Sequence, residues 1–128
     1  MEQPIAEVGL PCLDEATALP GVLAALPPGV RAIVVDNGST DETAAIARAH
    51  PAATQVVTGP GRGPGPARNA GVAATDADRI AFTDADCVPT PGWLQALLAS
   101  PGDVVQGRVE PDPAAERSPW ERTLAVPA

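Results

Sequence analysis

Short runs of apolar residues, each followed by turn-forming residues, predict five β-strands along the chain. They cover residues 5–10, 31–36, 54–58, 79–83 and 103–109. Between them, apolar side chains recur at helical spacing, so each intervening segment would present one apolar stripe. Strands that alternate with helices predict an α/β fold, in which a mostly parallel sheet is flanked by helices.

Residues typical of helix starts and stops set the expected helix boundaries. Ser39 and Glu42 have the spacing of a capping box. They predict a helix over 41–49, which Pro51 would end. The other helices are expected to begin at prolines: one near residue 20, one over 66–74 and one after residue 91.

The length of 128 residues corresponds to one ordinary domain. Strand and helix patterns continue to about residue 110, with a glycine-rich loop over 59–65. Residues 111–128 are rich in turn-forming residues and have no clear periodicity. We therefore expect a domain over 1–110 and a turn-rich C-terminal segment over 111–128.

The charge balance excludes several classes of partner. Sixteen acidic residues stand against eight arginines and no lysine, for a net charge of -8. A basic face for nucleic acid or anionic lipid cannot be assembled from this composition. An anionic nucleotide remains a possible ligand if a divalent cation lies between it and the protein.

Cysteine usage and hydropathy indicate a cytoplasmic protein. Cys12 and Cys87 are far apart in the sequence and form neither a CxxC pair nor a Cys/His cluster, so we expect two reduced thiols. The first residues lack the basic and apolar regions of a signal peptide. No apolar run is long enough to span a bilayer, so we expect no membrane span in this chain.

Acidic residues follow three of the predicted strands. Asp14 and Glu15 lie after the first strand, Asp36 ends the second, and Asp84 and Asp86 follow the fourth. The carboxyl ends of parallel strands share one edge of the sheet, where α/β proteins bind their ligands. Two carboxylates two residues apart repel each other unless a hard divalent cation such as Mg²⁺ lies between them. The pattern therefore predicts a cation site at this edge, made by Asp84 and Asp86.

Four strings occur in an order and spacing that closely resemble family 2 glycosyltransferases. They are PCLDE at 11–15, VVDNGSTD at 34–41, ARNAG at 67–71 and AFTDAD at 81–86. The resemblance runs from about residue 8 to 109. It implies the GT-A fold, a Rossmann-like sheet that binds a nucleotide-diphosphate sugar, usually a uridine one, together with magnesium or manganese.

The resemblance also implies roles for individual residues. Asp36 is similar to the family aspartate that binds the base, Arg68 to the basic residue that touches the nucleotide, and Asp84 to the residue near the ribose. Asp86 corresponds to the direct metal ligand, with Asp84 beside it. The nucleotide-sugar site would comprise Pro11, Asp14, Glu15, Asp36, Asn37, Ser39, Arg68 and Asp84. Asp14 stands where the family more often has Asn.

The catalytic residue is not assigned. Inverting transfer needs a carboxylate base for the acceptor hydroxyl, and in the family that base lies downstream of the Asp-x-Asp string. No acid after Glu110 matches that motif, so we expect a truncated domain that binds the donor without transferring sugar at a useful rate. The acceptor is not indicated.

Other functions remain open at this point. A donor-binding module without turnover is one. A haloacid-dehalogenase-like phosphatase that uses Asp84 and Asp86 is another, although three predicted strands precede that string where the phosphatase motif normally lies on the first. A sugar-phosphate nucleotidyltransferase is the third, although its glycine-rich signature should follow the first strand.

Overall fold

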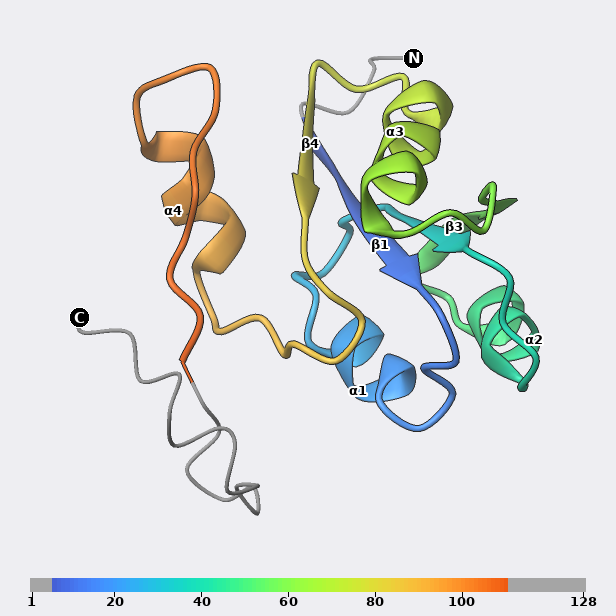
Figure 1. Ribbon diagram of the computed structural model, residues 1–128. Helices are drawn as coiled ribbons and strands as arrows, with labels where there is room; N and C mark the ends of the chain where they lie inside the picture. The colour runs from blue at the N-terminus through green and yellow to red at the C-terminus, as the bar shows by residue number, and fades with distance from the viewer. Residues whose placement is uncertain (1–5, 111–128) are drawn as a thin grey trace, which may run out of the picture.

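The computed structural model describes residues 6–110, in which strands and helices alternate (Figure 1). Their order is β1 (Ala6–Cys12), α1 (Leu19–Ala24), β2 (Ala32–Asp36), α2 (Thr43–Ala49), β3 (Ala53–Thr58), α3 (Pro64–Ala74), β4 (Arg79–Phe82) and α4 (Trp93–Ala99). The turn-rich segment expected at 111–128 lies outside the described residues.

The strands form one parallel sheet in the order β3-β2-β1-β4. In the register, Gly9 of β1 lies between Ile33 of β2 and Phe82 of β4. Strand β1 lies inside the sheet, between β2 and β4. A helix lies between each strand and the next strand along the chain. The predicted α/β architecture with helices flanking a parallel sheet is confirmed.

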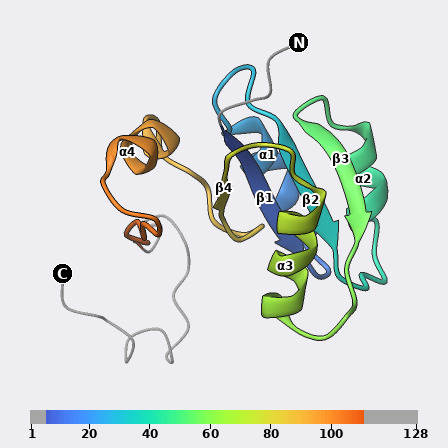
Figure 2. The same ribbon diagram turned by 90° about the horizontal axis from the view of Figure 1, so that it is seen from above.

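Alternating side chains of the central strands face two different layers. Val34 belongs to the larger buried cluster with Val8 and Leu10, which α1 and α2 cover. Ile33 and Val35 point the other way and pack against α3. Figures 1 and 2 show α3 on one face of the sheet and α1 with α2 on the other. Both faces are covered because a central parallel strand is apolar on both sides.

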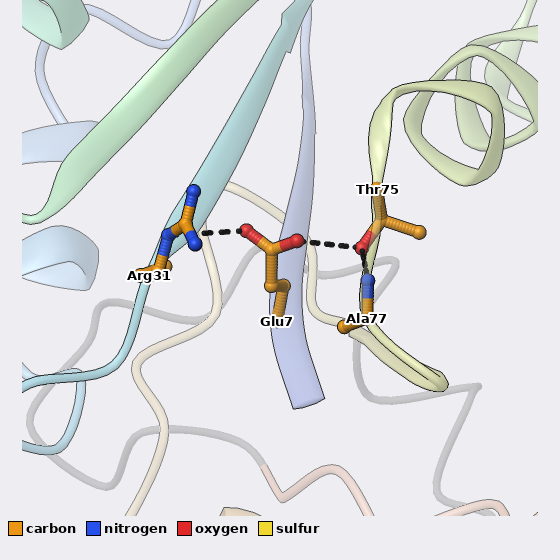
Figure 3. Close-up of polar contacts among 4 residues, drawn as sticks. All are labelled: Glu7, Arg31, Thr75 and Ala77. Carbon is orange, nitrogen blue, oxygen red and sulfur yellow. Dashed lines mark hydrogen bonds and ion pairs between the residues drawn. The ribbon is translucent and has the colours of Figure 1, made fainter. Parts of the chain in front are cut away.

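A buried carboxylate connects three elements at the end of the sheet opposite the strand tips (Figure 3). Glu7 of β1 is 3% exposed, and its Oε2 lies 3.6 Å from Nε of Arg31. Thr75, which ends α3, donates a hydrogen bond from Oγ1 to Glu7 Oε1 at 2.7 Å. Ala77 N–H in turn donates to Thr75 Oγ1. This network attaches the C-terminal end of α3 to the sheet.

The prediction of a strand over 103–109 is wrong. These residues run alongside α4, as Figure 1 shows in orange, and Gly107 lies close to Leu97. Val104 and Val109 are 92% and 78% exposed, and only Val105 between them is half-buried, so the segment has no buried apolar face of the kind a sheet strand presents. A strand needs a hydrogen-bonded neighbour, and within the described residues this segment pairs with none.

The predicted capping box is also wrong. Helix α2 begins at Thr43, so its N-cap residue is Glu42, and the Glu42 side chain makes no capping hydrogen bond. Asp41 supplies the contact instead, because its Oδ1 accepts from Thr43 N–H at 3.0 Å. Ser39 is used elsewhere, as described below. The predicted helix over 66–74 begins earlier, at Pro64.

None of the helices within residues 6–110 has both the length and the apolar character that a bilayer crossing requires.

Candidate functional site

A pocket of about 260 Å³ lies at the carboxyl ends of β1, β2 and β4. The first turn of α3 closes one side of it, and the turn that follows β4 closes another. Its walls are formed by Pro11, Cys12, Leu13, Glu15, Asn37, Gly63, Pro64, Ala67, Asp84, Ala85 and Asp86.

The structure brings some of the expected site residues into this pocket and leaves others outside its walls. The pocket wall includes Pro11, Glu15, Asn37, Asp84 and Asp86. The remaining expected residues lie in the adjoining loops, at the end of β2 or on α3: Asp14, Ser39, Asp36 and Arg68.

Three potential metal ligands gather directly after β4. One ligand atom each from Asp84, Asp86 and Cys87 lies within 4.8 Å of the other two. Cys87 Sγ is 3.5 Å from Asp86 Oδ1, and Cys87 N–H donates to the Asp84 carbonyl at 3.0 Å. The turn therefore holds two exposed carboxylates side by side, a donor set that suits a hard divalent cation with open coordination positions.

Electrostatic repulsion is concentrated in the same place. Partial burial and then the nearby carboxylates raise the pKa of Glu15, and the carboxylates responsible are Asp86, Asp41, Asp84 and Asp14. Burial, followed by the charge of Asp86, raises the pKa of the Cys87 thiol to about 11. The pocket thus collects negative charge that a cation would neutralise.

The loops after β1 and β2 are joined by Asp14 and Ser39. Asp14 has a left-handed backbone, with φ of 53°. Its N–H donates to Ser39 Oγ at 3.0 Å, and its Oδ1 accepts from Thr40 N–H at 2.7 Å. An aspartate tolerates this backbone conformation better than most residues. Both side chains predicted to bind the nucleotide thus also hold the rim of the pocket together.

The end of β2 organises the second loop and the glycine-rich loop. Asp36 Oδ1 accepts from Ser39 N–H at 3.1 Å. The next residue, Asn37, is 7% exposed and contacts the glycine-rich loop at two points. Its Oδ1 accepts from Gly61 N–H at 2.8 Å, and its Nδ2 donates to the Gly63 carbonyl at 3.1 Å.

Arg68 of α3 faces the tip of β4. Its Nη2 lies 3.7 Å from Asp84 Oδ1. Both side chains are largely exposed, at 45% and 63%, so the pair contributes little to stability. An exposed guanidinium beside the pocket remains available to an anionic ligand.

Several pocket residues were not predicted from the sequence. Gly63 and Pro64 belong to the turn that opens α3, and the glycine run before a proline was the signal for such a turn. Cys12 is the last residue of β1 and is buried, which raises its thiol pKa to about 12. No local pattern distinguishes a buried pocket cysteine from an ordinary core cysteine.

The fold and the site together define a class of protein. A parallel α/β sheet has a pocket at its strand tips, with a carboxylate pair after β4 and a helix N-terminus alongside. This arrangement is typical of nucleotide-binding α/β domains. The profile described as glycosyl transferase family 2 matches residues 8–120. The chain therefore belongs to glycosyl transferase family 2.

Curated relatives are similar over most of this chain. An uncharacterized glycosyltransferase of Mycobacterium tuberculosis, Rv0539, is 47% identical over 116 residues, covering 88% of this chain and 52% of the relative. The pre-mycofactocin glycosyltransferase of the same species is 39% identical over 94 residues, covering 71% of this chain and 20% of the relative. The chain thus spans about half the length of Rv0539 and a fifth of the length of the pre-mycofactocin glycosyltransferase.

Solved structures of Staphylococcus aureus TarS share the fold. TarS 1–349 superimposes with a TM-score of 0.63 at 22% identity, covering 73% of this chain and 31% of that one. The complex of TarS 1–349 with UDP gives a TM-score of 0.64 over the same shares. These likenesses confirm the expected GT-A architecture.

Proposed function

We propose that this chain binds a nucleotide-diphosphate sugar, with uridine as the nucleoside, through magnesium or manganese. The observation that carries the proposal is the pocket in which Glu15, Asp84 and Asp86 surround one volume at the strand tips. Family membership and the UDP bound to TarS support the choice of ligand. The reaction that we propose for this domain is transfer of the sugar to an acceptor with inversion.

Asp84 and Asp86 would hold the cation. When bound, the cation neutralises the diphosphate and stabilises it as a leaving group. The two carboxylates supply the negative oxygens for which such an ion has high affinity, and the exposed turn leaves room for water and phosphate ligands. Glu15 faces them across the pocket and adds to the negative field.

The first turn of α3 would approach the phosphates. Gly63 and Pro64 line the pocket, and the helix that starts there runs for 11 residues. Free N–H groups and the positive end of the helix dipole both favour an anion at such a terminus. Asn37 holds this turn in place through the Gly63 carbonyl.

The nucleoside would lie towards β1, β2 and α3. Asp36 ends β2 and would bind the base, while Pro11 near the end of β1 and Asp14 in the loop after β1 would lie beside it. Arg68 now pairs with Asp84. In the complex, Arg68 would contact the nucleotide, with or without that pair, and Asp84 would lie near the ribose. Ser39 would support this side of the site through Asp14.

A donor-binding module without turnover is the second candidate, because the roles assigned to the pocket residues are binding of the donor and the cation, and none of them is assigned as the catalytic base. The two candidates share the donor site and differ in the acceptor side and the catalytic base. The phosphatase alternative is less favoured, since the family match covers the Asp84–Asp86 string within a glycosyl transferase profile.

Titration calorimetry of UDP tests the donor site. With about millimolar Mn²⁺, we expect UDP to bind, and with excess chelator we expect the heat to disappear, because the net charge of -8 opposes an anion. Uridine, which has no phosphate, serves as the control ligand and should show no dependence on Mn²⁺. Equal UDP binding with and without chelator would contradict the role of the cation.

A further inference from the structure

The single phenylalanine of the chain packs against two glycines from different elements. A Cβ atom on Gly9 of β1 would lie 2.6 Å from Cε1 of Phe82, and a Cβ atom on Gly71 of α3 would lie 3.2 Å from the same atom. Gly9 is also the direct neighbour of Phe82 in the sheet. The ring therefore occupies space that any other residue at either position would fill. We refer to Gly9, Gly71 and Phe82 as the Phe82 slot.

Neither glycine is needed for its own backbone conformation. Gly9 lies inside a strand and Gly71 inside a helix, and neither has a positive φ. A glycine in the interior of either element weakens it, because the backbone loses more entropy on folding and has no side chain to pack. What the two positions share is the close approach of the ring, which accounts for glycine at both.

The slot lies directly beside the carboxylates at the tip of β4. Thr83 N–H donates to the Gly9 carbonyl at 3.2 Å, which extends the pairing of β4 with β1 by one residue. Asp84 follows immediately. Gly71 is one helical turn from Arg68, so the ring contact and the Arg68–Asp84 pair connect the same face of α3 to the same end of β4.

The ion pair cannot by itself determine where Asp84 lies. Both of its side chains are largely exposed, and exposed pairs are weak. In contrast, Gly9 and Gly71 are buried, Phe82 is half-buried, and the contact between the ring and the two glycines is sterically tight. Helix α3 is also attached at its other end, where Thr75 donates to Glu7. A methyl group added at position 71 would therefore be accommodated mainly by displacement of Phe82 and the end of β4.

We infer that Gly9 and Gly71 are positioning residues, which seat Phe82 so that Asp84 and Asp86 lie where they can hold the cation. The inference about the cation rests on the proposed function. The inference about position does not, since it concerns the backbone after β4 in the protein without any ligand.

The variant Gly71→Ala tests the inference, with Gly21→Ala as the matched control. Gly21 also lies in a helix, and nothing is within 4 Å of a Cβ placed there. In the 128-residue chain without metal, we expect Gly71→Ala to shift the backbone amide resonances of residues 84–87, and Gly21→Ala to leave them unchanged. Shifts at 84–87 that are no larger in Gly71→Ala than in Gly21→Ala would overturn the inference.

A second variant separates positioning from general destabilisation. Phe82→Leu replaces the ring by a smaller side chain, which leaves room for a methyl group at position 71. The double variant Gly71→Ala/Phe82→Leu should therefore return the 84–87 resonances towards those of Phe82→Leu alone. With UDP present, Gly71→Ala should weaken Mn²⁺ binding, measured by electron paramagnetic resonance, by roughly tenfold, as loss of a supporting contact does at metal sites. The double variant should recover most of that loss. Additive rather than compensating effects would argue against the slot.

The two readouts distinguish failure of this inference from failure of the proposed function. If the unaltered chain binds no Mn²⁺ with UDP, the proposed donor site is wrong, and the amide resonances still decide whether the slot sets the position of residues 84–87. If Mn²⁺ binds equally well to Gly71→Ala and to the unaltered chain, the donor site stands and the slot is only a packing contact.

Discussion

The side-chain amide of Asn37 donates a hydrogen bond to the carbonyl oxygen of Gly63 at 3.1 Å. Its Oδ1 accepts from Gly61 N–H, and the side chain is almost fully buried. The end of β2 is thereby connected to the loop that opens α3. One wall of the pocket is formed by the contact itself, since Asn37 and Gly63 both line it.

Replacing Asn37 by Ala should therefore destabilise the protein and the pocket together. The Gly61 N–H and the Gly63 carbonyl would lose their partner, which costs about 0.5–1.5 kcal/mol for each hydrogen bond. Urea denaturation measures the loss. Asn69→Ala is the control, because Asn69 is exposed on α3 and should change stability by no more than about 0.5 kcal/mol. Equal losses in both variants would contradict this account.

Gly59 and Gly65 should respond in opposite directions to alanine. A Cβ atom on Gly59 would lie 2.6 Å from Asn37 Oδ1, so Gly59→Ala should cost about 1–3 kcal/mol through overpacking. Nothing lies within 4 Å of a Cβ on Gly65, which belongs to α3. Gly65→Ala should be neutral or stabilising by up to about 1 kcal/mol, since alanine favours helix. Thermal melts of the two variants provide the comparison, and a loss of stability in Gly65→Ala would show that the space is not free.

Asp86→Asn should lose Mn²⁺-dependent UDP binding and keep its fold. Loss of a residue that merely supports a metal site costs about tenfold or more in affinity, and loss of a ligand should cost at least as much. Without metal, the variant should melt at the same temperature or higher, because one of the repelling carboxylates has gone. Asp76→Asn, an exposed acid far from the strand tips, is the matched control. Normal binding by both Asp86→Asn and Asp84→Asn would place the cation elsewhere.

Cys87 should react slowly with iodoacetamide. Its thiol pKa is raised to about 11 by burial and by Asp86, so little thiolate exists at about pH 7.5, and labelling should accelerate as the pH rises towards that pKa. Asp86→Asn removes the neighbouring charge and should speed the labelling of Cys87. Cys12, with a pKa raised to about 12 and a buried side chain, should be slower still. Mass spectrometry of the two peptides follows both sites, and faster labelling of Cys12 would contradict the assignment.

Glu15→Gln should stabilise the metal-free protein at neutral pH. The pKa of Glu15 is raised in the folded state, so the folded state holds its proton more tightly than the unfolded chain does. Stability therefore falls as the pH rises through the raised pKa. The variant should melt above the unaltered chain at about pH 7, and the difference should shrink as the pH falls below about 4.3, the ordinary value for glutamate.

Glu42→Gln is the control for this pH dependence, because Glu42 is exposed at the start of α2. It should leave the melting temperature almost unchanged at both ends of the range. A Glu15→Gln variant that melts below the unaltered chain at neutral pH would mean that the Glu15 carboxylate makes a stabilising contact.

The strands, their parallel arrangement and the clustering of acids at one edge could be predicted from the sequence because each depends on a local pattern. Alternation and apolar runs located β1 to β4 within a few residues. Once the sheet is parallel, all strand tips share an edge, so Glu15, Asp84 and Asp86 had to approach one another. Four strings in family order then indicated the ligand, which local patterns alone do not specify.

Tertiary structure determined the hydrogen-bond partner of each polar group. Ser39 has the local spacing of a helix cap, yet its Oγ accepts from Asp14 N–H in another loop, and Asp41 serves α2 instead. The segment 103–109 has the alternation of a strand, yet it lies along α4 and pairs with no strand within the described residues. Hydrogen bonds and sheet edges are satisfied by whatever group lies closest in space, and that proximity is set by the packing of elements distant in sequence. For the same reason the pairing of Gly9 and Gly71 around Phe82 emerged only when β1, α3 and β4 came together.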